Sequence, residues 1–176
     1  DNVETIISIY NAVVKGIPSM ERVVTVTGDG VVNPGNYKVL FGTNQNELIE
    51  AAGGLKEGCE KVISGGPMMG FAMYTTDTPI TKTSSSILCM SKDEVSACEP
   101  TACINCGRCV DACPSRIIPS RLADFAERHD EEAFLKFNGL ECVECGSCSY
   151  VCPAKRQLKQ AIGSMRKTAL ANKKKK

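Results

Sequence analysis

The chain has 176 residues, of which 43% are apolar, and a formal net charge of +1. This length suffices for one ordinary domain or for two small ones in series. The near-neutral total conceals a division, because acids outnumber bases up to residue 153 while residues 154–176 hold bases and no acid. A nucleic-acid-binding protein would place its basic face on the folded part, so the charge pattern excludes that class.

No run of about 18 apolar residues occurs, and the first residues lack the basic and apolar regions of a signal peptide. We therefore expect a soluble, cytoplasmic chain without a transmembrane segment. The chain starts without Met, directly on a helical pattern, which suggests a fragment of a longer protein. His129 is the only histidine and is expected at the surface, which excludes the usual hydrolase triads.

The first 64 residues alternate between helical and extended patterns. Residues 4–15 have helical spacing that Gly16 and Pro18 end, and valines on both sides of Asp29-Gly30 predict a hairpin with its turn at that dipeptide. Residues 37–41 predict a further strand, 45–55 a helix and 61–64 another strand. A hairpin, a helix and a returning strand in so short a stretch indicate a compact α+β unit of the β-grasp kind.

Glycines surround Pro67 in the segment that follows, residues 65–70. Backbone amides freed by glycines do bind anions. No basic side chain lies nearby to neutralise a phosphate, however, so we favour a tight turn after the strand, with Met68 and Met69 packing on their neighbours.

An internal repeat fills the second half of the chain. The run Cys-x2-Cys-x2-Cys-x3-Cys-Pro occurs twice, and it accounts for eight of the eleven cysteines. These eight are Cys103, Cys106, Cys109 and Cys113 in the first run, and Cys142, Cys145, Cys148 and Cys152 in the second. Between the runs, apolar residues from Leu122 to Phe137 have amphipathic helical spacing, and we expect Gly139 to cap the last helix.

The spacing of these cysteines is typical of 4Fe-4S clusters. Each iron of such a cubane takes one soft, anionic ligand from the protein, and thiolates supply it. In two-cluster ferredoxins the fourth cysteine of a run binds the other cluster. We therefore expect Cys103, Cys106, Cys109 and Cys152 to bind one cluster, and Cys142, Cys145, Cys148 and Cys113 to bind the second. We expect each fourth cysteine to open a helix.

Two other uses of the cysteines fit less well. Zinc needs only four sulfurs per ion, usually as separated pairs, and does not call for two complete runs with a trailing proline. A disulfide framework suits secreted proteins, and an odd number of cysteines leaves one over. The remaining three, Cys59, Cys89 and Cys98, are expected to be ordinary thiols.

The last segment predicts a basic amphipathic helix. Leu158, Ile162, Met165 and Ala169 share one helical face amid lysines and arginines. Such a helix can pack on the cluster domain, or it can lie on an anionic membrane surface or an acidic subunit. The sequence leaves these alternatives open.

The sequence resembles the RnfC (RsxC) family, a peripheral component of Rnf-type electron transport complexes, over nearly its whole length. The resemblance rests on residues 21–28, Asn33-Pro34, Gly42-Thr43, residues 62–70 and 79–83, and the doubled cysteine run. It implies an N-terminal helix and linker at 1–22 and a β-grasp (SLBB-like) domain with following strands at 23–90. It further implies a mainly helical ferredoxin domain with two 4Fe-4S clusters at 91–156 and a basic helix and tail at 157–176.

The resemblance also implies a function. The chain would be an electron-transferring iron–sulfur fragment of a membrane-associated NADH:ferredoxin oxidoreductase complex, with the other Rnf subunits as partners at the cytoplasmic face of the membrane. FMN and NADH would bind only in an upstream region that this chain lacks, so the fragment alone would not be catalytic. A free ferredoxin-type carrier and a non-redox β-grasp binding module are the alternatives.

Overall fold

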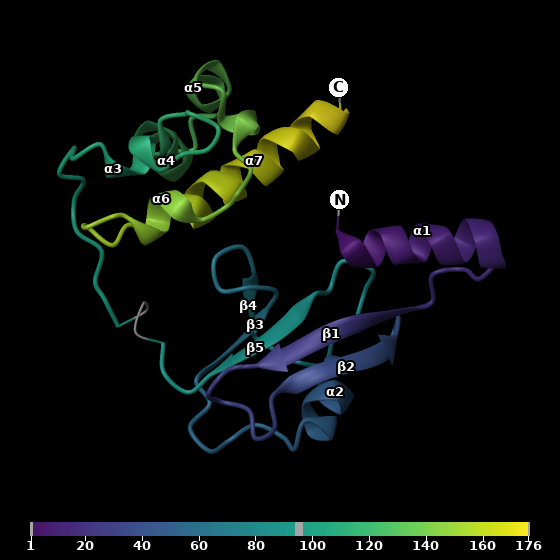
Figure 1. Ribbon diagram of the computed structural model, residues 1–176. Helices are drawn as coiled ribbons and strands as arrows, with labels where there is room; N and C mark the ends of the chain where they lie inside the picture. The colour runs from purple at the N-terminus through teal and green to yellow at the C-terminus, as the bar shows by residue number, and fades with distance from the viewer. Residues whose placement is uncertain (1, 94–96, 176) are drawn as a thin grey trace. The chain divides into compact units, whose positions relative to one another are not determined.

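The computed structural model describes residues 2–93 and 97–175. The chain divides into two compact units, which are described separately: a sheet unit, Asp1–Asp93, and a cysteine unit, Glu94–Lys176. The elements of the sheet unit are α1 (Val3–Lys15), β1 (Glu21–Thr27), β2 (Gly35–Leu40), α2 (Gln45–Ala51), β3 (Lys61–Ser64), β4 (Phe71–Met73) and β5 (Ser86–Met90) (Figure 1). Those of the cysteine unit are α3 (Arg108–Asp111), α4 (Pro119–Glu127), α5 (Glu131–Lys136), the 3-10 helix η1 (Gly139–Glu141), α6 (Ser147–Tyr150) and α7 (Leu158–Lys175).

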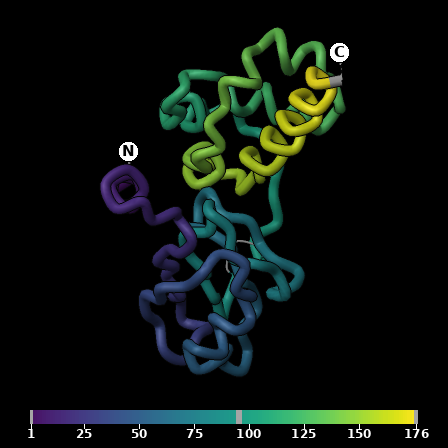
Figure 2. The backbone as a smooth tube through the Cα atoms, turned by 90° about the vertical axis from the view of Figure 1, so that its right-hand side faces the viewer, coloured from purple at the N-terminus to yellow at the C-terminus, as the bar shows by residue number. Residues whose placement is uncertain are grey.

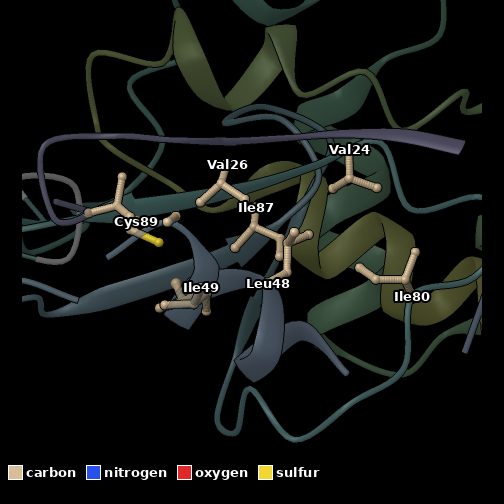
Figure 3. Close-up of a cluster of buried hydrophobic side chains, with 10 residues drawn as sticks. Val24, Val26, Leu48, Ile49, Ile80, Ile87 and Cys89 are labelled. Carbon is tan, nitrogen blue, oxygen red and sulfur yellow. The ribbon is translucent and has the colours of Figure 1, made fainter. Parts of the chain in front are cut away.

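The sheet unit is built on a five-stranded mixed sheet in the order β2-β1-β5-β3-β4. Strands β1 and β5 are parallel, and the other neighbours are antiparallel. Helix α2 covers one face, where its Leu48 and Ile49 meet Val26 of β1 and Ile87 of β5 (Figure 3). These four side chains are almost fully buried. The α+β class with a β-grasp-like sheet is therefore confirmed.

The hairpin predicted between residues 23–26 and 31–32 does not form, because Val31 makes an isolated bridge with Leu55 instead. Strand β1 pairs with β2, from Glu21 opposite Leu40 to Val26 opposite Gly35, so the connection is much longer than two residues. Asp29 and Gly30 instead form hydrogen bonds with residues at the end of β5. Asp29 accepts a hydrogen bond of 3.0 Å from the Ser91 N–H, and Gly30 donates one of 3.0 Å to the carbonyl of Cys89.

The glycine-rich segment after β3 is a tight turn, as predicted. The Gly70 N–H donates to the Gly66 carbonyl over 2.8 Å, and a Cβ on Gly70 would lie 2.5 Å from that same oxygen. Only glycine fits such an approach. Met68 and Met69 are exposed, however, so their predicted packing is wrong.

Helix α1 forms as predicted and buries none of its residues. Asn2 caps its start by accepting a hydrogen bond from the Glu4 N–H, and Gly16 ends it in the left-handed conformation. Glu4 attaches the helix to β1, because its carboxylate accepts hydrogen bonds from the Val23 N–H at 2.8 Å and from Arg22 at 3.0 Å. These contacts between α1 and β1 are polar.

The cysteine unit has a small helical core. Leu122 of α4, Phe134 of α5 and Leu158 and Ile162 of α7 are fully or almost fully buried and pack together. The path of the chain through this unit, ending in α7, is followed in Figure 2.

The connection after α5 differs from the predicted glycine cap. Asn138 takes the left-handed conformation there. Gly139 instead lies flat on the Phe134 ring, since a Cβ on it would come within 2.3 Å of a ring carbon.

Helix α7 packs within the cysteine unit, which was one of the alternatives for the basic tail. Its apolar residues Leu158, Ile162, Met165 and Ala169 are buried within the cysteine unit. The apolar face therefore packs on the cysteine-bearing segments and is not available to a membrane. Within the described part of the chain, none of the helices has the length and hydropathy needed to cross a bilayer.

Candidate iron–sulfur centres

Two cavities in the cysteine unit are lined by the eight repeated cysteines. The first is lined by Cys103, Cys106, Cys109 and Cys152, and the second by Cys142, Cys145, Cys148 and Cys113. Each cavity thus takes three cysteines from one run and one from the other.

The backbone repeats along with the cysteines. Asn105 and Glu144, which precede the second cysteine of each run, both have φ of 54°. Gly107 and Gly146, which follow it, have φ of 78° and 84°. Two left-handed residues around one cysteine curl the chain so that three thiols face the same side. The conformation is thus set by position in the run, since even Asn and Glu adopt it.

The fourth cysteine of each run lies after a helix and does not open one. Helix α3 carries Cys109 and ends at Asp111, and helix α6 carries Cys148 and ends at Tyr150. The next helices, α4 and α7, start only at Pro119 and Leu158. Cys113 and Cys152 therefore sit in turns, and the prediction that they open helices is wrong.

The thiols of the second cavity differ in how easily they ionise. Burial raises the pKa of Cys142 and raises that of Cys148 to about 11. Hydrogen bonding with Ser147, 3.5 Å from Sγ to the hydroxyl oxygen, lowers the pKa of Cys145. Iron is bound by thiolates, so loading this cavity must displace protons from buried thiols.

The arrangement suits a cluster better than a single ion. Among residues 2–93 and 97–175, no three His, Cys, Asp or Glu side chains converge closely enough to hold one metal ion. In a cubane each of four irons takes its own thiolate, so the four cysteines surround a volume and do not meet at a point. Two cavities with four cysteines each match that requirement.

Several residues that line the cavities were not predicted. The first cavity is also lined by Ser120 and Arg156, and the second by Glu144 and Lys159. Arg156, Lys159 and Ser120 come from segments after the runs, so their place depends on how α4 and α7 pack. The sequence repeat could have pointed to Ser120 and Lys159, because they are separated by the same number of residues as Cys103 and Cys142.

Arg156, which lines the first cavity, forms ion pairs with two residues of α4. Its Nη2 lies 2.9 Å from carboxylate oxygens of both Asp124 and Glu127. Burial opposes the charge on Arg156, but the hydrogen bonds to Asp124 and Glu127 outweigh it, and its pKa is raised. The guanidinium therefore stays charged beside the cavity.

The other three cysteines line neither cavity, within the part of the chain that the structure describes. Cys89 is fully buried in the core of the sheet unit, where burial raises its pKa to about 11, and Cys59 packs against that same core. Cys98 is exposed.

Comparison with known protein families defines the class of both units. Residues 23–72 match the SLBB domain, and residues 102–156 match the 4Fe-4S dicluster domain. The second match contains all eight repeated cysteines. The chain therefore has an SLBB domain followed by a dicluster domain, and it carries two 4Fe-4S clusters.

Three proteins with similar sequences are subunits of ion-translocating complexes. The chain is 48% identical over 162 residues to the C subunit of the proton-translocating ferredoxin:NAD(+) oxidoreductase complex of Clostridium ljungdahlii, a match that covers 92% of this chain and 35% of the relative. It is 39% identical over 174 residues to the Na(+)-translocating counterpart of Acetobacterium woodii, covering 99% of this chain and 39% of the relative. For the C subunit of the ion-translocating oxidoreductase complex of Yersinia enterocolitica, the identity is 41% over 132 residues, 74% of this chain and 19% of the relative.

These relatives confirm the resemblance to the RnfC family that the sequence indicated. The chain spans little more than a third of the length of the first two.

Proposed function

We propose that this chain relays electrons through its two clusters as part of the RnfC component of an Rnf-type ferredoxin:NAD+ oxidoreductase complex. The observation that supports it is the pair of cavities, each lined by four cysteines. A 4Fe-4S cluster accepts and releases one electron. The protein's part is to hold the two clusters side by side in one small unit and to limit their contact with water.

The proposal includes the ligands. Cys103, Cys106, Cys109 and Cys152 bind the first cluster, and Cys142, Cys145, Cys148 and Cys113 bind the second. Two features support this assignment: the lining of each cavity and the repeated left-handed backbone around Cys106 and Cys145. Because each cluster then joins both runs, the iron also ties the two ends of the unit together.

The names of the relatives, which describe subunits of ion-translocating complexes, support other subunits of such a complex as partners. We place the chain at the cytoplasmic face of the cell membrane, held there by the other subunits. FMN and NADH, on this proposal, act in parts of a longer polypeptide outside these residues. Any membrane contact of the tail would use the exposed lysines at its end, such as Lys173 and Lys174, since the apolar face of α7 is buried.

Anaerobic reconstitution with iron and sulfide tests the cofactor content. We expect about eight irons per chain, and an EPR spectrum of the reduced protein in which two spins interact. Four irons, or two zinc ions, would contradict the proposal.

Paired substitutions test the crossed ligation. Cys113→Ser should impair the cluster of the second cavity, and Cys152→Ser should impair that of the first. The exposed Cys98→Ser serves as the control and should leave both clusters intact. If Cys113→Ser instead impairs the cluster of its own run, the ligands are not exchanged between runs.

A deletion of residues 157–176 is a poor test of docking, although the basic tail invites it. It would remove Leu158 and Ile162 from the core of the cysteine unit. Replacing Lys173 and Lys174 by Gln leaves that core alone. We expect those replacements to weaken binding to vesicles that contain anionic lipids, in a salt-dependent way, with iron content unchanged.

A further inference from the structure

The two cavities share a backbone but differ in charge at one equivalent position. Asn105 and Glu144 have the same φ of 54°, and each lines the cavity of its own run. Asparagine tolerates the left-handed conformation because its short amide can bond locally, whereas a glutamate there is strained. Since the position in the run sets this conformation for both residues, what distinguishes Glu144 is its charge.

The surroundings of Glu144 are shaped to hold its carboxylate. Arg166 of α7 places Nη1 3.2 Å from Oε1, and its Nε donates to the Leu140 carbonyl over 3.1 Å. Gly163 lies one turn earlier in α7, and a Cβ there would come within 3.1 Å of Oε2. Glycine inside a helix costs about 1 kcal/mol of stability relative to alanine. At Gly163 the missing side chain leaves space for the Glu144 carboxylate.

Glu144 also reaches the thiols through its backbone. Its N–H donates to Cys142 Sγ over 3.4 Å. The carboxylate is three-quarters buried, so water screens its field less than that of a surface charge. The equivalent Asn105 side chain is uncharged, with Oδ1 3.8 Å from Cys103 Sγ.

The other lining residues also differ in charge between the two cavities. At the first cavity the charged residue is Arg156, whose equivalent at the second is the apolar Ile117. The second cavity has Lys159 where the first has Ser120. Among the described lining residues, Glu144 is thus the acidic one.

We propose that Glu144 lowers the reduction potential of the second cluster. The inference rests on the proposed ligation of Cys142, Cys145, Cys148 and Cys113. Reduction adds an electron to the cluster, and a fixed negative charge nearby opposes it, so the second cluster is harder to reduce. Glu144 is a positioning residue, which acts through its field and its N–H bond.

The internal repeat supplies mirror-image variants for a redox titration followed by EPR. Glu144→Gln keeps the side-chain shape and should shift the second cluster to a less negative potential, with the first unchanged. Asn105→Asp should shift the first cluster to a more negative potential, with the second unchanged. If neither variant moves its own cluster, or if both clusters move together, the inference is overturned.

Arg166→Gln separates a charge effect from a structural one. It leaves the Glu144 carboxylate without its partner, so the second cluster should move to a more negative potential, opposite to Glu144→Gln. A merely structural ion pair would make both variants shift that cluster in the same direction, which would refute the inference. If Glu144→Gln retains about eight irons and its potential is unchanged, the role of Glu144 alone is refuted. Absence of the two-cluster signal in the unmodified protein would instead refute the proposed function.

Discussion

The sheet unit and the cysteine unit use buried cysteine in opposite ways. In the sheet unit Cys89 is an apolar filler, packed among Val26, Ile87 and the residues of α2 (Figure 3). In the cysteine unit Cys148 is almost as buried, yet it faces a cavity that it shares with three other cysteines. The first unit therefore uses its buried cysteine for packing, whereas the second also directs cysteines at two cavities. Burial raises the pKa of both Cys89 and Cys148 to about 11, so the pKa does not distinguish them. The two thiols differ in what surrounds them.

Removal of iron should produce the largest difference between the units. With a chelator under anaerobic conditions, we expect the two cysteine runs to lose fixed structure, because metal binding supplies part of the folding free energy of such sites. The sheet should remain folded on its apolar core. Amide signals of isotopically labelled protein report on both units at once. Well-dispersed signals from residues 103–116 and 142–155 without iron would show that the runs fold unaided.

The contrast also explains which features the sequence predicts. Helices α1 and α2 and strand β3 are predicted well, since each has its own periodicity and stop signals. The turn at Asp29-Gly30 is not, because its partners Cys89 and Ser91 lie about 60 residues away and no local pattern announces them.

The cysteine unit shows the same limit at its candidate site. The spacing within each run predicts which cysteines are candidate ligands, because that spacing is itself local. Arg156 and Lys159 could not be predicted in the same way. Both line the cavities only because the segment leading into α7 packs against the unit, and tertiary packing leaves little trace in a single sequence.

Gly28→Ala should damage the sheet unit alone. Gly28 has φ of 112°, and a Cβ there would lie 1.8 Å from the Cys89 carbonyl oxygen. Strain and collision together should lower the free energy of unfolding of this unit by about 3 kcal/mol or more. Gly54→Ala is the matched control: φ is 86° but no atom lies within 4 Å, so only the strain of about 1 kcal/mol applies. Equal losses in the two variants would mean that the approach to Cys89 is unimportant.

Alkylation rates compare the filler cysteine with an exposed one. Burial raises the pKa of Cys89 from 9.0 to about 11, so at pH 8 its thiolate fraction falls about a hundredfold relative to an unperturbed thiol. We expect iodoacetamide to modify the exposed Cys98 at least a hundredfold faster, as followed by mass spectrometry of peptides. The same shift makes the stability from Cys89 fully present below pH 9 and lost as the pH rises from 9 to about 11, because the unfolded thiol ionises first. Comparable rates for Cys89 and Cys98 would show that the sheet core opens readily.

Helix caps give the smallest expected effect, and they test whether a helix belongs to its unit's core. Asn44 caps α2, accepting a hydrogen bond from the Asn46 N–H at 2.9 Å, and α2 buries Leu48 and Ile49 against the sheet. Asn44→Ala should therefore cost about 1 kcal/mol in global unfolding of the sheet unit. Asn2 caps α1 with the same geometry, but α1 buries nothing. Asn2→Ala should fray α1 without changing the denaturant midpoint of the sheet, because a helix that contributes no core cannot transmit the loss of its cap. A shared decrease in that midpoint would show that the Glu4 contacts couple α1 to the sheet.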